Sequence, residues 1–384
     1  MTGRTPLVDE AERARISRTG LGETLFVEAG AGTGKTTQLV ERVINLVLHD
    51  GIPLRHLAAI TFTEAAGAEL RDRIRQRLEE VLETLPEGPA RGAAELALAE
   101  SDVAAIGTLH SFALRILGEH PLDVGLPPRV EVLDEVSSQL AFEDRWQAFV
   151  DELYDDPDCE DLLRFAHVAR IHIESGPGKA SLRDVATVFG DNWDRLPVDE
   201  PDLGPLPALD WQPLDDAVAA LEALLPECRD PSDKLYTRIT TVVLPEVRAL
   251  RSLDDPYRQL QVLEAKSGKW RRGSGGSGKC WEHVGTAKEA VDAIDDAARA
   301  VRGAAIDAVL RRLGARLARF THAEAERRRR EGRLEFHDLL VLARELVRTS
   351  PGARAALHDR YQRLLLDEFQ DTDPIQIEVA TRIA

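Results

Sequence analysis

The stretch Leu25-Phe-Val-Glu-Ala-Gly-Ala-Gly-Thr-Gly-Lys-Thr-Thr37 decides the fold of this chain. Residues 25–27 predict the end of a buried strand, residues 28–34 a loop of small residues, and residues 37–48 an amphipathic helix. Glycines let backbone N–H groups surround an oxyanion, and the helix N-terminus adds its dipole. Lys35 can place a positive charge on the outer phosphates, and the Thr36 hydroxyl suits Mg²⁺. We therefore predict a phosphate-binding loop.

The expected nucleotide-binding residues run from this loop into the helix. They are Ala29, Gly30, Ala31, Gly32, Thr33, Gly34, Lys35, Thr36 and Thr37. The loop departs once from the pattern G-x-x-x-x-G-K-[ST], because Ala29 stands at the first glycine. A chance glycine-rich turn is the alternative, but the flanking strand and helix are what phosphate binding requires.

Composition bounds the classes of protein. The 384 residues are enough for two or three domains, and no apolar run approaches the length of a membrane helix. The net charge of −18 argues against a generally basic surface for nucleic acid, although it allows a local basic groove. Three cysteines far apart indicate a reducing cytoplasm, and the C-x-x-H spacing of Cys280 and His283 lacks the second pair of a metal site.

Alternating patterns predict an α/β fold with a parallel sheet. Continuous apolar runs indicate buried strands at residues 57–62, 103–106 and 363–366, with helices after the first two. Residues 137–323 show helical periodicities with few strand signals. Within them, the glycine- and serine-rich residues 266–279 predict a flexible linker or loop tip.

The acidic stretch Asp367-Glu-Phe-Gln-Asp-Thr-Asp373 follows the last predicted strand. Ligands of open α/β sheets bind at the carboxyl ends of the strands, so this stretch should lie beside the phosphate-binding loop. Asp367 is then suited to hold Mg²⁺, Glu368 to activate water as a base, and Gln370 to sense the terminal phosphate. A solvated acidic turn is the alternative if this stretch is taken alone.

Four segments together resemble the UvrD-like superfamily 1 DNA helicases, most closely the AddA/RecB type. Residues 27–36 resemble the Walker A motif, and Leu365-Leu-Asp-Glu-Phe-Gln-Asp-Thr-Asp-Pro-Ile-Gln376 resembles Walker B. Ile60-Thr-Phe-Thr-Glu-Ala-Ala-Gly-Ala-Glu-Leu-Arg-Asp-Arg-Ile74 resembles motif Ia with one extra residue before Glu69, and Gly107-Thr-Leu-His-Ser-Phe112 resembles the segment that follows it.

The resemblance implies a RecA-like P-loop NTPase domain, formed by residues 1–120 and 326–384 and interrupted by a mainly helical insertion, residues 121–325. It implies ATP and Mg²⁺ as cofactors, with Lys35, Asp367 and Glu368 as catalytic residues. It also implies an ATP-dependent, 3′–5′ type helicase of DNA repair or recombination, whose possible partner is a nuclease or recombination protein. The later family motifs are absent, so we expect an N-terminal fragment with little activity of its own.

The same resemblance implies contacts with single-stranded DNA from Thr61, Phe62, Thr63, Thr108, His110 and Ser111. Backbone amides and hydroxyls at helix starts can bind phosphates, and aromatic rings can stack on bases. For Phe62 a place in the core is an equal alternative, as is a capping or core role for His110. The adenine-sensing glutamine of the family is replaced by Glu12.

Two other functions remain as alternatives. One is a non-catalytic nucleic-acid-binding or assembly module derived from such a helicase. The other is a P-loop ATPase that does not act on DNA, against which the Asp367–Thr372 stretch and the motif Ia match argue. DNA-stimulated ATP hydrolysis separates these functions.

Overall fold

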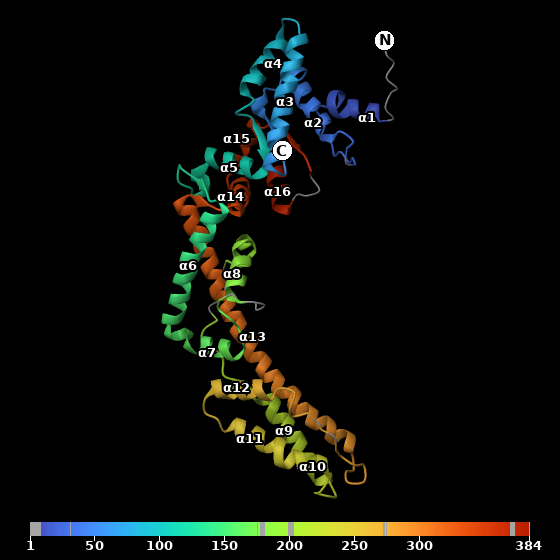
Figure 1. Cartoon of the computed structure of the whole chain (residues 1–384), viewed down its shortest axis with the longest axis vertical. Coiled ribbons are helices and arrows are strands. Elements are labelled where there is room, and N and C mark those ends of the chain that lie inside the picture. Colours follow the sequence, from blue (N-terminus) through green and yellow to red (C-terminus); the bar gives the residue numbers. More distant parts are fainter. Residues whose placement is uncertain are drawn as a thin grey trace. The chain divides into compact units, whose positions relative to one another are not determined.

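The computed structural model describes residues 9–30, 32–174, 176, 181–198, 203–271, 273, 275–368 and 373–383. The chain divides into two compact units, which Figure 1 shows in blue to teal and in red for unit 1, and in green to orange for unit 2. Unit 1 contains Met1–Val136 and Glu326–Ala384, and unit 2 contains Ser137–Ala325. Unit 1 is mixed α/β, and the described part of unit 2 is mainly helical.

A three-stranded parallel sheet lies at the centre of unit 1. Its order is β2-β1-β5, with bounds Ala105–Thr108, Leu57–Thr61 and Arg363–Leu366. Thr61 pairs with Thr108 and Ile60 with Leu366, so the carboxyl ends of the three strands meet at one edge. The predicted parallel sheet is thus confirmed, although β2 begins two residues later than predicted.

Helices of unit 1 pack around this sheet. One buried cluster joins the apolar faces of α2, α3 and α4 to β1, β2 and β5. Elsewhere α5 packs on α14, which also contacts α15 and α16. These helices are α2 Lys35–Leu48, α3 Glu64–Thr84, α4 Pro89–Glu100, α5 Leu109–Glu119, α14 Phe336–Thr349, α15 Pro351–Arg360 and α16 Pro374–Ile383.

The prediction of a buried strand at residues 25–27 is wrong. The segment has no regular secondary structure, and Phe26 and Val27 are 79% and 44% exposed. A buried strand needs a hydrogen-bonded neighbour, and β1 already has β2 on one side and β5 on the other. The outer edges of β2 and β5 carry no further strand among the described residues, so this apolar run forms no ladder with either of them.

Two glycines allow α3 to lie close to the sheet. A Cβ atom on Gly67 would lie 2.9 Å from the Gly107 Cα, which is closer than packed carbon atoms approach. A Cβ on Gly107 would in turn lie 2.7 Å from the Ser111 Oγ. Gly67 belongs to residues 60–74, the segment that resembles motif Ia with one extra residue. Because Gly67 has no side chain, this segment can lie in close contact with β2.

The end of the long helix α13, Val284–Glu331, is fixed to α14 by a buried ion pair. The Arg328 guanidinium donates two hydrogen bonds to the Asp338 carboxylate, at 2.7 and 2.8 Å, and both residues are buried. Arg329 donates to the Val124 carbonyl oxygen. The basic run at residues 327–330 therefore serves, at these two positions, to hold unit 1 together.

The core of unit 2 forms along one face of α13. Buried α13 residues recur every three or four positions, from Ala287 through Val291 and Ile294 to Leu317, and Trp146, Trp270 and Trp281 complete the cluster. Such spacing places apolar side chains on one stripe of a helix. The other helices are α6 Glu135–Asp155, α7 Glu160–Val168, α8 Leu182–Gly190, α9 Gln212–Leu224, α10 Lys234–Arg238, α11 Leu244–Arg251 and α12 Pro256–Lys266.

Part of the segment predicted as a flexible linker is packed. The Ser277 N–H donates to the Asp233 carboxylate at 3.1 Å, and the Trp281 indole N–H donates to the same carboxylate at 3.0 Å. Gly276 has φ +85°, and a Cβ there would lie 3.0 Å from Leu235. Glycine is favoured at this position because the positive φ would strain another residue and because the neighbouring side chains would have to shift.

Candidate functional site

The phosphate-binding loop leads directly into α2. Gly34 precedes the helix with φ +88° and Gly32 has φ +75°, a region that glycine enters without strain. No side chain of the described residues caps the N-terminus of α2, so its first N–H groups can bind an anion. The backbone therefore fits a phosphate group.

The acidic stretch after β5 lies beside this loop. The Lys35 Nζ is 3.5 Å from the Glu368 Oε2, and both side chains are partly exposed. Asp367 continues the ladder, with its N–H donating to the Ile60 carbonyl oxygen at 2.8 Å. The fold thus brings together residues 35 and 368, which are far apart in the sequence, as the position of the acidic stretch predicted.

Glu368 has an unusual backbone conformation. Its φ of +54° lies in the left-handed region, which costs a residue other than glycine roughly 1–3 kcal/mol. Its N–H donates to the Asp367 Oδ1 at 3.1 Å, which helps to hold this turn. Strained residues of this kind gather at functional sites, where a side chain must point in one direction.

Oxygen ligands suited to Mg²⁺ are present at the same site. Thr36 lies in the first turn of α2, and the Asp367 carboxylate lies at the end of β5. A hydroxyl and a carboxylate are the hard oxygen donors that Mg²⁺ prefers. Two predicted nucleotide-binding residues, Ala31 and Gln370, lie outside the described residues.

Two of the six expected DNA-contacting residues are buried and hydrogen-bonded within unit 1. The Thr61 hydroxyl donates to the Thr63 carbonyl oxygen at 3.1 Å. The Thr108 hydroxyl donates to the Glu64 carboxylate at 2.6 Å and accepts from the Ser111 N–H at 3.2 Å. Their hydroxyls therefore shape the starts of α3 and α5.

The other four reach the surface to different degrees. Phe62 is 54% exposed, so it is not a core residue, and Thr63 and Ser111 are also exposed. The half-buried His110 ring meets the Phe336 ring edge-on, with centroids 5.7 Å apart. Burial lowers the pKa of His110, which favours its neutral form.

Sequence patterns missed one arginine that contacts the phosphate-binding loop and one that holds the segment before it. Arg13 donates a hydrogen bond to the Thr33 carbonyl oxygen of the phosphate-binding loop at 3.0 Å. Arg42 on α2 donates to the carbonyl oxygens of Ile16, Leu21 and Glu23. The only sequence signal for Arg13 was its spacing of four from Asp9, which by itself indicates a helix pair. Glu12 lies exposed on α1, Glu10–Ala14.

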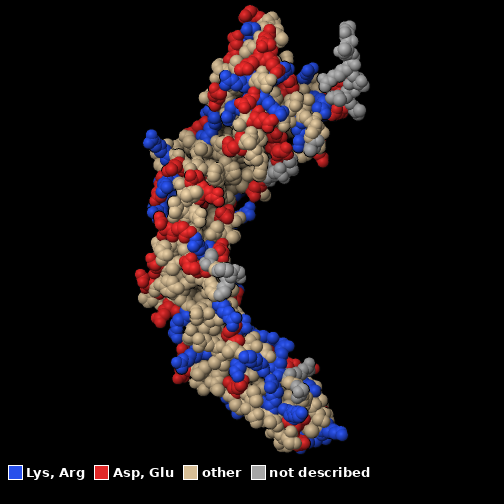
Figure 2. All heavy atoms as spheres, in the orientation of Figure 1, with Lys and Arg blue, Asp and Glu red and all other residues tan. Residues whose placement is uncertain are grey.

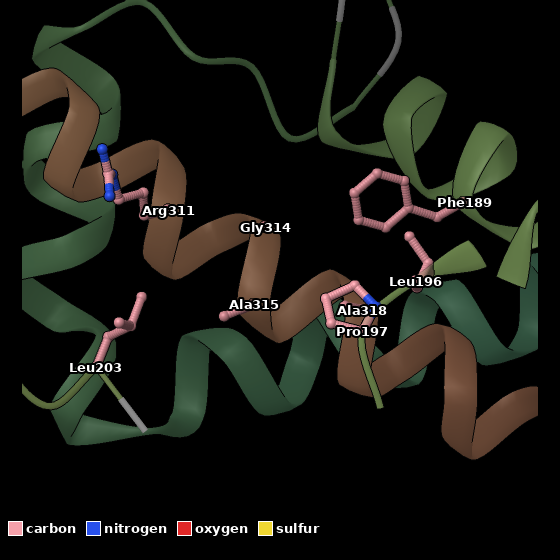
Figure 3. Close-up of a pocket in the computed structure, with 8 residues that line it drawn as sticks. All are labelled: Phe189, Leu196, Pro197, Leu203, Arg311, Gly314, Ala315 and Ala318. Carbon is pink, nitrogen blue, oxygen red and sulfur yellow. The ribbon is translucent and has the colours of Figure 1, made fainter. Parts of the chain in front are cut away.

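Unit 2 contains a separate cavity of about 370 Å³. Figure 3 shows its largely apolar lining, which consists of Phe189, Leu196, Pro197, Leu203, Arg311, Gly314, Ala315 and Ala318. Its one charged lining residue, Arg311, pairs with Asp307 at 2.8 Å. This lining differs from that of unit 1's phosphate-binding loop, because few polar groups converge on it.

Two further features are absent from the residues that the structure describes. Within the described residues, no group of three or more His, Cys, Asp and Glu side chains is arranged to hold a metal ion. Across the same part of the chain, no helix has both the length and the apolar composition needed to cross a membrane. Cys159, Cys228 and Cys280 are free thiols.

Comparison with known proteins gives consistent matches. The A subunits of two ATP-dependent helicase/nucleases are 27% identical over 98% of this chain in Carboxydothermus hydrogenoformans and 25% identical over 94% in Ligilactobacillus salivarius. The chain spans about a third of these relatives, 34% and 32% of their lengths. The relative of the same name from Desulforamulus reducens is 37% identical over 36% of this chain and 11% of its own length. Because the family model of the UvrD/REP helicase N-terminal domain matches residues 9–384, through both the phosphate-binding loop and the strand that carries Asp367, this chain belongs to that family.

Proposed function

We propose that this protein is an ATP-dependent DNA helicase or translocase of DNA repair or recombination, 3′–5′ in type, acting in the cytoplasm. The observation that supports this most directly is the 3.5 Å contact between Lys35 and Glu368, which joins a phosphate-binding loop to the carboxylates that follow β5. The relatives are named as A subunits of helicase/nucleases, which supports a partner subunit and an associated nuclease activity.

Each residue of the site has a role in this proposal. Lys35 and the N–H groups at the start of α2 bind the phosphates of ATP. Thr36 and Asp367 hold Mg²⁺, which neutralises charge on the phosphates when bound. Glu368 orients the attacking water and accepts its proton, and Gln370 responds to the terminal phosphate.

Single-stranded DNA would contact the edge of the sheet next to this site. Phe62, Thr63 and Ser111 are exposed there, with the half-buried His110 beside them, whereas the buried Thr61 and Thr108 hold the backbone that presents them. An exposed aromatic ring beside helix N-termini is suited to stack on a base while backbone N–H groups bind phosphates.

A local basic region in unit 2 adds support for DNA binding. Residues 229–279 carry eleven Lys and Arg against six Asp and Glu, in a chain whose net charge is −18. Figure 2 shows Lys and Arg side chains gathered over the part of unit 2 that contains α10 to α12. Arg258, Lys269 and Lys279 are exposed, so this part of the surface can attract phosphates despite the acidic composition.

We place the domain boundaries as the sequence predicted, with a RecA-like domain at residues 1–120 and 326–384 and a helical accessory domain at residues 121–325. The two compact units support this division, although residues 121–136 pack with unit 1. ATP hydrolysis then belongs to unit 1, whose site holds Lys35, Asp367 and Glu368.

The test measures Mg·ATP binding by calorimetry and steady-state ATP hydrolysis with and without single-stranded DNA. Lys35→Ala should abolish binding or weaken it severely. In the full-length parent, Glu368→Gln should retain binding and lower hydrolysis by roughly 100-fold or more, because it removes the base. Equal ATP affinity in Lys35→Ala and the parent would refute the nucleotide site.

Glu79→Gln is the matched control, because Glu79 is an exposed carboxylate on α3 that pairs with Arg75 on the same helix, at 3.4 Å. It should leave both measurements unchanged. DNA-independent hydrolysis would favour a P-loop ATPase that does not act on DNA. DNA binding without any hydrolysis would favour a non-catalytic module.

A further inference from the structure

A segment before the phosphate-binding loop is fastened to α2. The Arg42 guanidinium donates to the carbonyl oxygens of Ile16 at 2.6 Å, Leu21 at 3.1 Å and Glu23 at 3.0 Å. The Asn45 side chain donates to the Ser17 carbonyl oxygen at 2.8 Å. These bonds satisfy carbonyl groups where the chain leaves α1, and they fix the segment relative to the helix that begins at Lys35.

Arg13 extends from this fastened segment to the loop itself. Its Nη2 donates to the Thr33 carbonyl oxygen at 3.0 Å, and its Nε donates to the Asp9 carboxylate at 3.0 Å. Its Nη1 also lies beside Gly34, at 3.6 Å from the position that a Cβ atom would take on that glycine. The Arg13 side chain is only 26% exposed, so it is held against the turn between Thr33 and Gly34.

We propose that Arg13 is a positioning residue of the nucleotide site, which holds the Thr33–Gly34 turn in the conformation that binds the phosphates of ATP. This proposal rests on the proposed function. Gly30, Gly32 and Gly34 make the loop conformationally free, and ordering it on binding costs entropy. A hydrogen bond that orders the turn in advance lowers that cost.

The contacts of Arg13 indicate that it acts on phosphate binding by positioning the loop rather than by its charge. Asp9 pairs with Arg13 at 2.8 Å, so its carboxylate largely offsets the charge that Arg13 presents to a phosphate. The carbonyl oxygen of Thr33 accepts from Arg13, while the Thr33 hydroxyl donates to the Gly30 carbonyl oxygen at 2.8 Å. Two bonds thus fix the turn without occupying the N–H groups that face a phosphate.

The experiment compares Arg13→Ala with Arg15→Ala. Arg15 lies two residues away on the same segment, and its guanidinium donates at 2.6 Å to Glu23, which lies outside the loop. Calorimetry measures the dissociation constants of Mg·ATP and Mg·ADP, and hydrogen exchange of the ligand-free protein measures the protection of residues 28–37. Chemical denaturation checks that each variant remains folded.

Arg13→Ala should weaken the binding of both nucleotides roughly 10-fold and accelerate exchange in the loop, as expected for loss of a hydrogen bond from a charged donor. Arg13→Lys should restore part of both losses, because an ammonium group can still donate to one carbonyl oxygen. Arg15→Ala should change neither. Faster exchange with unchanged affinity would overturn the proposal, as would equal behaviour of the two alanine variants.

Failure of the proposed function gives a different result. If Lys35→Ala bound ATP as well as the parent, the nucleotide site itself would be wrong. If Lys35→Ala lost binding while Arg13→Ala kept it, only the role of Arg13 would be wrong.

Discussion

Unit 1 and unit 2 achieve their folds in different ways. In unit 1 the central strand β1 pairs with β5, so the sheet joins residues about 300 positions apart, such as Ile60 and Leu366. In unit 2 the helices between residues 137 and 283 contribute side chains to a core along one face of α13. Unit 1 therefore depends on long-range pairing, and unit 2 depends on the stripe of one helix.

This difference explains where the candidate site lies. Parallel strands bring their carboxyl ends to one edge, and loops from distant parts of the sequence meet there. Lys35 and Glu368 come together for this reason. Helices packed along one another create apolar surfaces, such as the lining of the cavity that contains Phe189 and Leu196.

The largest change in the free energy of unfolding is expected from the buried ion pair between the end of α13 and α14, within unit 1. Asp338→Ala removes the nearer of the two carboxylates that pair with the buried Arg328, at 2.7 Å against 3.8 Å for Glu335, which should destabilise unit 1 by about 3–5 kcal/mol. The free energy of unfolding from denaturant titration measures this. Glu331→Ala, which removes the exposed partner of Arg327, should change it by less than about 1 kcal/mol. Similar losses in both variants would show that burial of the pair is unimportant.

A matched pair of leucines tests whether the units are independent. Leu78 on α3 and Leu221 on α9 are both fully buried, so each Leu→Ala change should cost about 2–5 kcal/mol. We expect two melting transitions, and Mg·ATP should raise the melting temperature of unit 1, because ligand binding stabilises the unit that binds it. Leu78→Ala should lower the melting temperature of that same transition. Leu221→Ala should lower the other transition and leave ATP affinity unchanged. A single transition that both variants shift equally would contradict the division.

The start of α3 gives a smaller effect within unit 1. The Thr63 hydroxyl accepts from the Ala66 N–H at 3.1 Å, so Thr63→Ala should cost about 1 kcal/mol through loss of the helix cap. Thr63→Ser retains the hydroxyl and should be nearly neutral. Equal free energies of unfolding for the two variants would mean that the hydroxyl does not cap the helix.

The smallest effect concerns His110 and pH. Burial lowers its pKa in the folded state, with Glu64 opposing the shift and His337 adding to it. The unfolded chain, with a pKa of about 6.5, then binds the proton more readily. The contribution to stability is present above about pH 6.5 and is lost as the pH falls through the folded pKa. The free energy of unfolding, measured against pH, should therefore depend less on pH in His110→Gln, whereas substitution of the exposed His49 by Gln should leave the pH profile unchanged. The same pH profile in both variants would refute a contribution from His110.

Local patterns predicted the elements whose formation depends on neighbours in sequence. The apolar run at residues 57–62 became β1, Thr63 became the cap of α3, and the glycines before Lys35 became the loop that opens α2. A continuous apolar run was less informative at residues 25–27. The run predicted a strand from its apolar residues, but a strand also requires a neighbouring strand to which it can hydrogen-bond. Phe26 instead remains exposed.

The long-range contacts of Arg13 and Arg328 could not be predicted. Both arginines occur in helical sequence beside acidic residues, where an exposed helix pair is the ordinary expectation. Arg328 is instead buried against Asp338, and Arg13 reaches the carbonyl oxygen of Thr33. Which neighbour an arginine finds depends on how distant segments pack.

The sequence by itself determined the family, the α/β class and the residues of the phosphate-binding loop, because these depend on residue types at short, regular spacings. Tertiary structure decided that Lys35 lies 3.5 Å from Glu368, that Phe62 is exposed while Thr61 and Thr108 are buried, and that Arg13 holds the loop. The physical reason is the range of the interactions. Hydrophobic periodicity and helix capping act over a few residues, whereas burial and pairing across a sheet depend on the path of the whole chain.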